Sequence, residues 1–230
     1  MKDEKLIRVA IDGPAAAGKS TVAKKLANIL SFVYIDTGAM YRALTLEVLR
    51  NDIPLDDKAT ISALLKETEI TLKYEQGSQR VYIKDEDVTD KIRDNEVSLA
   101  VSHVAKIIEV RNEMVKRQRQ LANNINVIMD GRDIGTNVLP EAEVKIFLIA
   151  SVEERARRRY EENVRRGIES DLDALKHEIA ERDKRDMERE HAPLERAKDA
   201  INIDTTSMTI DEVVQTILTY VKKVQQNENV

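Results

Sequence analysis

The chain has 230 residues, enough for one sizeable hydrophobic core. Its formal net charge of −5 argues against attachment to nucleic acid through overall charge, so any phosphate binding must come from local clusters of Arg and Lys. The absence of Cys excludes disulfides and thiolate metal sites, and an aromatic content of 3% leaves few platforms for stacked bases. No segment has the pattern of a signal peptide or a membrane span. We therefore expect a cytoplasmic protein that binds neither nucleic acid nor membrane.

The first fifty residues predict alternating strands and helices. Residues 6–11 form a short apolar run typical of a buried strand, and residues 32–35 form a second. Apolar residues recur at helical spacing over residues 19–30 and 40–51. A strand, helix, strand and helix in this order favour a parallel α/β fold with right-handed crossovers.

The middle of the chain follows a different pattern. After a short helix near residue 61, residues 70–74 and 81–83 alternate apolar and polar side chains around Glu75-Gln76-Gly77-Ser78. This alternation predicts an antiparallel hairpin, to which Val88 and Thr89 add a short strand. We interpret the hairpin as an insertion into the parallel fold. A long basic stretch over residues 96–122 is expected to be helical.

The parallel pattern resumes in the second half. Residues 126–129, 144–149 and, more weakly, 201–203 predict strands, and helices are expected over residues 152–166, 171–190 and 210–224. Because no repeat or low-complexity linker interrupts the chain, we expect a single domain over residues 1–230.

Residues 13–20, GPAAAGKS, fit the phosphate-binding loop G-x-x-x-x-G-K-[ST] and lie between a predicted strand and a predicted helix. In such a loop, backbone N–H groups and the helix N-terminus surround the phosphates of a nucleoside triphosphate. Lys19 would place its charge on the outer phosphates, and the Ser20 hydroxyl can ligate Mg²⁺. The loop predicts triphosphate binding, but it occurs in switches and motors as well as kinases.

Two further motifs follow predicted strands: DTGAMYR at residues 36–42 and DGRDIG at residues 130–135. Ligands of open α/β sheets bind at the carboxyl ends of strands, so we expect Arg42 and Arg132 to converge there on a second anion. Asp130 could hold a water bound to Mg²⁺. A surface ion pair remains the alternative for Arg42, and a loop cap for Asp130.

Five segments together resemble the bacterial-type cytidylate kinases over essentially the whole chain: IDGPAAAGKST at 11–21, DTGAMYR at 36–42, the basic segment 110–119, DGRDIGT at 130–136 and ERDKRDMEREHAPL at 181–194. The resemblance implies a P-loop kinase core, with a parallel sheet flanked by helices. It also implies a monophosphate-binding region at about 37–111 that carries a β insertion at about 64–97, and an Arg-rich helical lid at about 153–170.

The same resemblance implies roles for individual residues. ATP would contact Gly13, Pro14, Ala15, Ala16, Ala17, Gly18, Lys19, Ser20 and Thr21. The phosphate of CMP would bind Arg42 and Arg132, the cytosine would lie among Thr37, Arg111, Asp133 and Arg189, and the ribose would contact Tyr41, Ser102, Arg182 and Asp186. Thr37 stands where family members often have Ser, which keeps the hydroxyl.

The chemistry of these residues agrees with such a site. An Asp accepts from the cytosine amino group while an Arg donates to its acceptors, and uracil would leave the carboxylate unpaired. Arg182, Asp186 and Arg189 share one helix face, for which a solvated salt-bridge face is the alternative. His103, His177 and His191 show no metal-ligand spacing and no paired nucleophile.

The lid candidates are Arg155, Arg157, Arg158, Arg159, Arg165 and Arg166, with neighbouring Glu residues available as ion-pair partners. We select Arg158 and Arg159, which with Lys19 and Arg132 would neutralise the charge of the transferring phosphoryl group.

The expected activity is direct transfer of a phosphoryl group from ATP, with Mg²⁺, to CMP and dCMP, by a monomer in pyrimidine nucleotide metabolism. Two alternatives stay open. One is a related kinase whose acceptor is uridylate, adenylate or a hydroxy acid, and the other is a non-enzymatic nucleotide switch that binds a protein or RNA.

Overall fold

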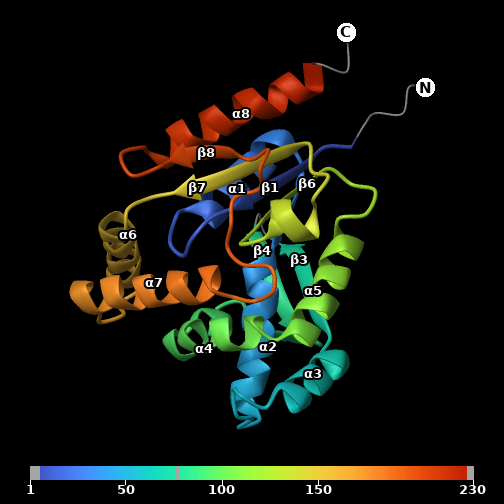
Figure 1. Ribbon diagram of the computed structural model, residues 1–230, viewed down its shortest axis with the longest axis vertical. Coiled ribbons are helices and arrows are strands. Elements are labelled where there is room, and N and C mark those ends of the chain that lie inside the picture. The colour runs from blue at the N-terminus through green and yellow to red at the C-terminus, as the bar shows by residue number, and fades with distance from the viewer. Residues whose placement is uncertain (1–5, 76–77, 227–230) are drawn as a thin grey trace. The chain divides into compact units, whose positions relative to one another are not determined.

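The computed structural model describes residues 6–75 and 78–226 (Figure 1) and divides into two compact units. The first, here called the core unit, comprises the chain up to Tyr34 and from Asn124 onward. The second, here called the inserted unit, comprises Ile35–Asn123.

A parallel sheet organises the core unit, as the sequence predicted. The strands run in the order β2 (Val33–Asp36), β6 (Val127–Gly131), β1 (Arg8–Asp12), β7 (Val144–Ile149) and β8 (Ile201–Asp204), and the boundary of the core unit falls within β2, after Tyr34. β1 pairs in parallel with β6 and β7, and β7 pairs in parallel with β8. Because the strands run in the same direction, their carboxyl ends all lie at the same edge of the sheet.

Two helices cover one face of this sheet. α1 (Lys19–Leu30) and α8 (Ile210–Gln226) share a buried apolar cluster with the strands, to which β1 contributes Ile11, α1 contributes Leu26 and α8 contributes Ile217. Figure 1 shows α8 lying along β7 and β8. α6 (Val152–Arg165) and α7 (Leu172–Met187) form a smaller cluster of their own around Ala156, Leu175 and Ile179.

In the turn after β1, the backbone of Gly13 packs directly against the backbone of β7. Gly13 has a φ of +147°, and a Cβ atom built there would lie 2.1 Å from the carbonyl oxygen of Leu148 on β7. Such a contact leaves no space for any side chain. The phosphate-binding loop therefore starts in a conformation that only glycine permits.

A short π-helical turn, η2 (Ile134–Val138), follows β6 and was not predicted. The buried carboxylate of Asp12, at the end of β1, accepts the backbone N–H groups of Ile134 and Gly135, each at 2.8 Å. The first N–H groups of a helical turn have no partner within the turn, and Asp12 accepts hydrogen bonds from two of them. These bonds connect the end of β1 to the segment after β6.

The inserted unit begins with α2 (Thr37–Arg50), which starts three residues before the predicted residue 40 because Asp36 caps it by accepting the Ala39 N–H at 2.8 Å. It continues with α3 (Lys58–Glu67), an antiparallel sheet of β3 (Ile70–Glu75), β4 (Ser78–Ile83) and β5 (Glu86–Asp87), and the short η1 (Lys91–Arg93).

The antiparallel sheet of the inserted unit agrees with the sequence in its hairpin and differs in its third strand. The predicted hairpin is confirmed, although Gln76 and Gly77 of its expected turn lie outside the described residues. The third strand lies at Glu86–Asp87, and its prediction at Val88 and Thr89 was wrong. Val88 instead donates its N–H to the carbonyl of Val81 at 2.8 Å and is fully buried, so its strand-like character reflects packing.

The prediction of one helix over residues 96–122 was also wrong. The chain forms α4 (Asn95–Ala105) and α5 (Ile108–Leu121), separated at Ile107, whose ψ of 121° is extended. The Ala105 carbonyl, left without a helical partner, accepts Arg111 Nη1 at 3.1 Å. Ile107 is itself buried, so tertiary packing overrides a sequence pattern that continued through it.

The close approach at Gly13 predicts a specific cost of substitution. Gly13→Ala should lower the free energy of unfolding by about 3 kcal/mol or more, because strain and overlap add at that position. Gly167→Ala is the matched control: its φ is +70° but a Cβ would meet nothing within 4 Å, so only about 1 kcal/mol of backbone strain is expected. Urea unfolding of both variants measures the difference, and equal costs would contradict the steric account.

Candidate functional site

Two sequence motifs begin where the neighbouring strands β1 and β6 of the core unit end, at the same edge of the sheet. In the β1–β6 register Ile11 lies opposite Asp130, and Asp12 lies opposite Gly131. The start of the phosphate-binding loop, after β1, therefore lies next to the start of the segment with Arg132 and Asp133, after β6. This is the carboxyl edge of the sheet, where open α/β folds bind ligands.

Two residues of the phosphate-binding loop have a left-handed backbone conformation, with a φ of +58° at Ala16 and +85° at Gly18. Such conformations turn successive N–H groups toward a common concavity. Lys19 is buried and donates from Nζ to the carbonyl of Pro14 at 2.6 Å. Burial, together with the positive charge of Arg132, lowers the pKa of Lys19 well below its ordinary value. A polyphosphate placed there would relieve this destabilised cation.

Asp130 accepts two hydroxyl groups at the end of β6. Ser20 Oγ donates to Asp130 Oδ2 at 2.8 Å, and the buried Tyr34 hydroxyl donates to Oδ1 at 2.8 Å. Nowhere in the described part of the chain do three or more His, Cys, Asp or Glu residues form a metal-binding group. One hydroxyl and one carboxylate still fit Mg²⁺, since this ion is commonly held by one or two carboxylates with substrate phosphates and water completing its shell.

Arg132 and Asp186 form an ion pair of 2.8 Å between the segment after β6 and α7. Burial would raise the pKa of Asp186, but the neighbouring arginines, Arg132 first among them, lower it below its ordinary value. Arg189 lies beyond the end of α7 at Met187, so the prediction that it shares a helix face with Arg182 and Asp186 was wrong; its Nε donates to the Asp186 carbonyl at 3.2 Å. The face of α7 that carries Arg182 and Asp186 is thus partly buried, and the alternative of a solvated salt-bridge face does not hold for Asp186.

Asp133 is buried and accepts Asn137 Nδ2 at 3.0 Å, so the turn η2 orients this carboxylate. Burial also raises the pKa of Asp12 to about 7, although the N–H groups it accepts oppose the shift. The two carboxylates are electrostatically coupled, because the charge of Asp133 contributes to that shift.

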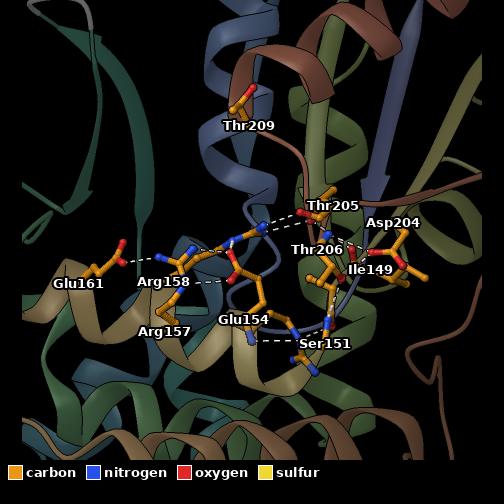
Figure 2. Close-up of polar contacts among 12 residues, drawn as sticks. Ile149, Ser151, Glu154, Arg157, Arg158, Glu161, Asp204, Thr205, Thr206 and Thr209 are labelled. Atoms are coloured by element: carbon orange, nitrogen blue, oxygen red, sulfur yellow. Dashed lines mark hydrogen bonds and ion pairs between the residues drawn. The ribbon is translucent and has the colours of Figure 1, made fainter.

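The arginines of α6 fall into distinct environments. Arg155 is buried and pairs with Asp183 at 2.5 Å, while Arg157 is exposed and pairs with Glu154 and Glu161. Figure 2 shows Arg158 extending from α6 to the segment after β8, where it donates to the Thr205 carbonyl at 2.5 Å and to Thr205 Oγ1 at 3.1 Å. Arg159 reaches Glu162 at 3.4 Å, and Arg165 and Arg166 are exposed.

Arg158 also lies next to the phosphate-binding loop. Its Nη1 would be 3.9 Å from a Cβ atom built on Gly18, and its Nε donates to Glu154 at 2.8 Å. Among the lid candidates, Arg158 therefore combines an orienting carboxylate, an anchor at Thr205 and proximity to the loop.

The inserted unit holds the other predicted residues. Thr37 opens α2, Tyr41 follows one turn later, and the Arg111 guanidinium lies 5.7 Å from the Tyr41 ring centroid. Arg42 pairs with Asp36 at 3.1 Å; because Asp36 is buried, this is not the surface ion pair that stood as the alternative. Ser102 Oγ is buried and has no hydrogen-bond partner within residues 6–75 and 78–226. The convergence of Arg42 with Arg132 stays a prediction, because the two belong to different units.

Sequence reasoning missed three side chains of the core unit: Asp12, Tyr34 and Asp183. Each contacts a motif residue or loop through a long-range hydrogen bond, and no local pattern marks such partners. Asp12 offered the only signal, because it lies directly before the phosphate-binding loop.

None of the helices in the described ranges has the length and apolar character that crossing a bilayer requires.

Comparisons with known proteins agree with one another. The model of the family described as cytidylate kinase matches residues 9–223. The chain is 62% identical to the cytidylate kinase of Geobacillus sp. (strain WCH70) over 217 residues, which are 94% of this chain and 97% of the relative. It is 56% identical to that of Bacillus subtilis (strain 168), over 96% of this chain and 98% of the relative.

A solved structure of an uncharacterized protein from Eubacterium ventriosum ATCC 27560 superimposes with a TM-score of 0.51 at 15% identity, covering 95% of this chain and 99% of that one. This likeness supports the fold alone. The match to the family model and the high identity to the named relatives carry the assignment: the chain belongs to the cytidylate kinase family.

Proposed function

We propose that the protein transfers the terminal phosphoryl group of ATP to CMP and dCMP, giving CDP and dCDP. The observation that carries this proposal is the register of β1 and β6. It brings the ends of the two strands to the same level, so the phosphate-binding loop after β1 starts next to the segment after β6 that contains Arg132 and Asp133. A phosphoryl donor and a phosphate-bearing acceptor bound there would meet at one sheet edge.

On the donor side, the loop at residues 13–21 would bind ATP, with backbone N–H groups of its later residues around the phosphates and Lys19 at the outer ones. Ser20 and Asp130 would hold Mg²⁺, Asp130 through a bound water. When bound, the ion would neutralise charge on the phosphate oxygens. Tyr34 keeps Asp130 oriented by its hydrogen bond, so the carboxylate is in place before any ligand binds.

On the acceptor side, Arg132 and Arg42 would hold the phosphate of CMP with bidentate hydrogen bonds. Each now pairs with a carboxylate, Arg132 with Asp186 and Arg42 with Asp36, so each guanidinium has a defined position but keeps further N–H donors. Cytosine recognition would fall to Asp133, Arg111, Arg189 and Thr37, and ribose contacts to Tyr41, Ser102, Arg182 and Asp186.

The chemical step is an in-line displacement. A phosphate oxygen of CMP attacks the γ-phosphorus of ATP as the bond to the β,γ-bridging oxygen breaks, and ADP leaves. No covalent intermediate or dedicated general base is required, since positioning and charge neutralisation do most of the catalysis. Lys19, Arg132, Arg158 and Arg159 would face the migrating group, and closure of the segment around 153–170 would exclude water. We expect the enzyme to act as a cytoplasmic monomer.

A substrate panel tests the proposed reaction. With ATP and Mg²⁺, CMP and dCMP should give diphosphate products, and kcat/KM for UMP should be lower by about two orders of magnitude or more, because uracil has a carbonyl where cytosine has the amino group that would donate to Asp133. Activity on AMP equal to that on CMP would contradict the cytidylate assignment. ATP hydrolysis unaffected by CMP, without CDP, would favour a nucleotide switch.

Arg158 and Arg157 form a matched pair on α6. Arg158→Ala should lower kcat/KM by about a hundredfold, because it removes a donor held beside the phosphate-binding loop. Arg157→Ala, which removes only exposed ion pairs, should stay within about twofold of the unaltered enzyme. Steady-state rates with CMP measure both; equal losses in the two variants would contradict a specific role for Arg158.

A further inference from the structure

A buried ion pair between α6 and α7 contacts the phosphate-binding loop directly. Arg155 Nη1 lies 2.5 Å from Asp183 Oδ2, and both residues are at most 6% exposed. Arg155 Nη1 also donates to the carbonyl of Ala15 at 3.1 Å, while the N–H of Ala15 donates to Asp183 Oδ1 at 3.3 Å. Both backbone polar groups of Ala15 are therefore bonded to the two members of one ion pair.

Apolar packing supports the same contact. The side chain of Ala16, the next residue of the loop, packs against the α6–α7 cluster of Ala156, Leu175 and Ile179. Arg155 is further fixed by donating from Nε to the carbonyl of Ala150 at 2.9 Å. The loop is thus held to α6 and α7 by polar and apolar contacts within the core unit.

The positive charge of Arg155 allows the Asp183 carboxylate to lie beside a loop that binds anions. An unpaired carboxylate beside a loop that receives polyphosphate would repel the ligand and would itself be costly to bury. Arg155 neutralises Asp183 at 2.5 Å and shares the loop contact with it. Arg155 is consequently committed to this pair, unlike Arg158.

We propose that Arg155 and Asp183 are positioning residues that hold the phosphate-binding loop in the shape that accepts ATP. The inference deepens the proposed function, because it rests on ATP binding to this loop. Since the Ala15 N–H is bonded to Asp183, the later N–H groups of the loop would surround the phosphates. α7 then supports both anion-binding motifs from one face, with Asp183 at the loop and Asp186, three residues later, at Arg132.

Direct ATP binding is the decisive measurement, made by calorimetry on the full chain with Mg²⁺ and ATP and without CMP. Asp183→Asn keeps the shape but removes the charge, and should raise the ATP Kd by about tenfold. Arg155→Met leaves the Asp183 carboxylate unpaired and should raise the ATP Kd by about a hundredfold. In the double variant Arg155→Met/Asp183→Asn, part of this loss should be recovered, because the repelling carboxylate is gone.

A purely structural role would give a different pattern. It would reduce the fraction of folded protein, leave the Kd of the folded fraction unchanged and make the double variant no better than Arg155→Met. Thermal unfolding of each variant establishes the folded fraction. Should Arg155→Met fail to fold, Arg155→Lys replaces it: the charge stays, but one nitrogen cannot keep every bond of the guanidinium, so a Kd increase of about fivefold is expected.

Glu143→Gln is the matched control. It breaks another partly buried ion pair of the core unit, Arg8–Glu143 at 2.9 Å, which lies where β1 begins and away from the loop. Its ATP Kd should stay within about twofold of the unaltered protein. An unchanged Kd in folded Asp183→Asn, or an equal increase in Glu143→Gln, would overturn the proposal. A wild-type chain that binds ATP but makes no CDP would refute the proposed reaction while leaving this test valid.

Discussion

Buried aspartates hold the groups of the core unit that would face phosphate. Asp130 orients Ser20, Asp186 orients Arg132, and Asp183 with Arg155 fixes the loop at Ala15. These interactions join the carboxyl ends of β1 and β6 to α7, so the site depends on them more than on any single strand or helix. Gly13, packed against the Leu148 carbonyl, sets where the loop starts.

Burial destabilises charged groups at the site, and a bound anionic ligand would offset this for Lys19. Burial lowers the pKa of Lys19 and raises that of Asp12, which shows that both charged forms are destabilised in the protein alone. A bound polyphosphate would place negative charge beside the buried ammonium group of Lys19 and stabilise its charged form. Dipoles and cations fixed before the reaction need not reorganise during it, which is the basis of electrostatic catalysis.

Much of the fold could be predicted from the sequence. The buried strands β1 and β7 are rich in apolar residues, and α1 carries apolar residues at helical spacing, so local pattern and tertiary environment agree. The phosphate-binding loop was predictable because its glycines and Lys19 serve a local mechanism. The break at Ile107 was not, because a buried residue there interrupts a pattern that is helical on both sides.

The missed parts of the site share a physical reason. Asp183 lies on a helix so rich in charge that its sequence is typical of a solvated face, and only the tertiary contact with Arg155 shows that this carboxylate is buried. Asp12 and Tyr34 act on residues more than 90 positions away. Partners at such separations are fixed by topology and leave no periodic signal in the sequence.

The central claim is that two anion-binding groups serve one transfer: the phosphate-binding loop with Lys19, and Arg132 with Arg42 from the inserted unit. A crystal structure with CMP and a non-hydrolysable ATP analogue tests it most directly. The account predicts both guanidinium groups within hydrogen-bond distance of the CMP phosphate, with that phosphate in line with the terminal phosphate of the analogue. CMP bound with its phosphate away from Arg132 or Arg42, or turned away from the loop, would contradict it.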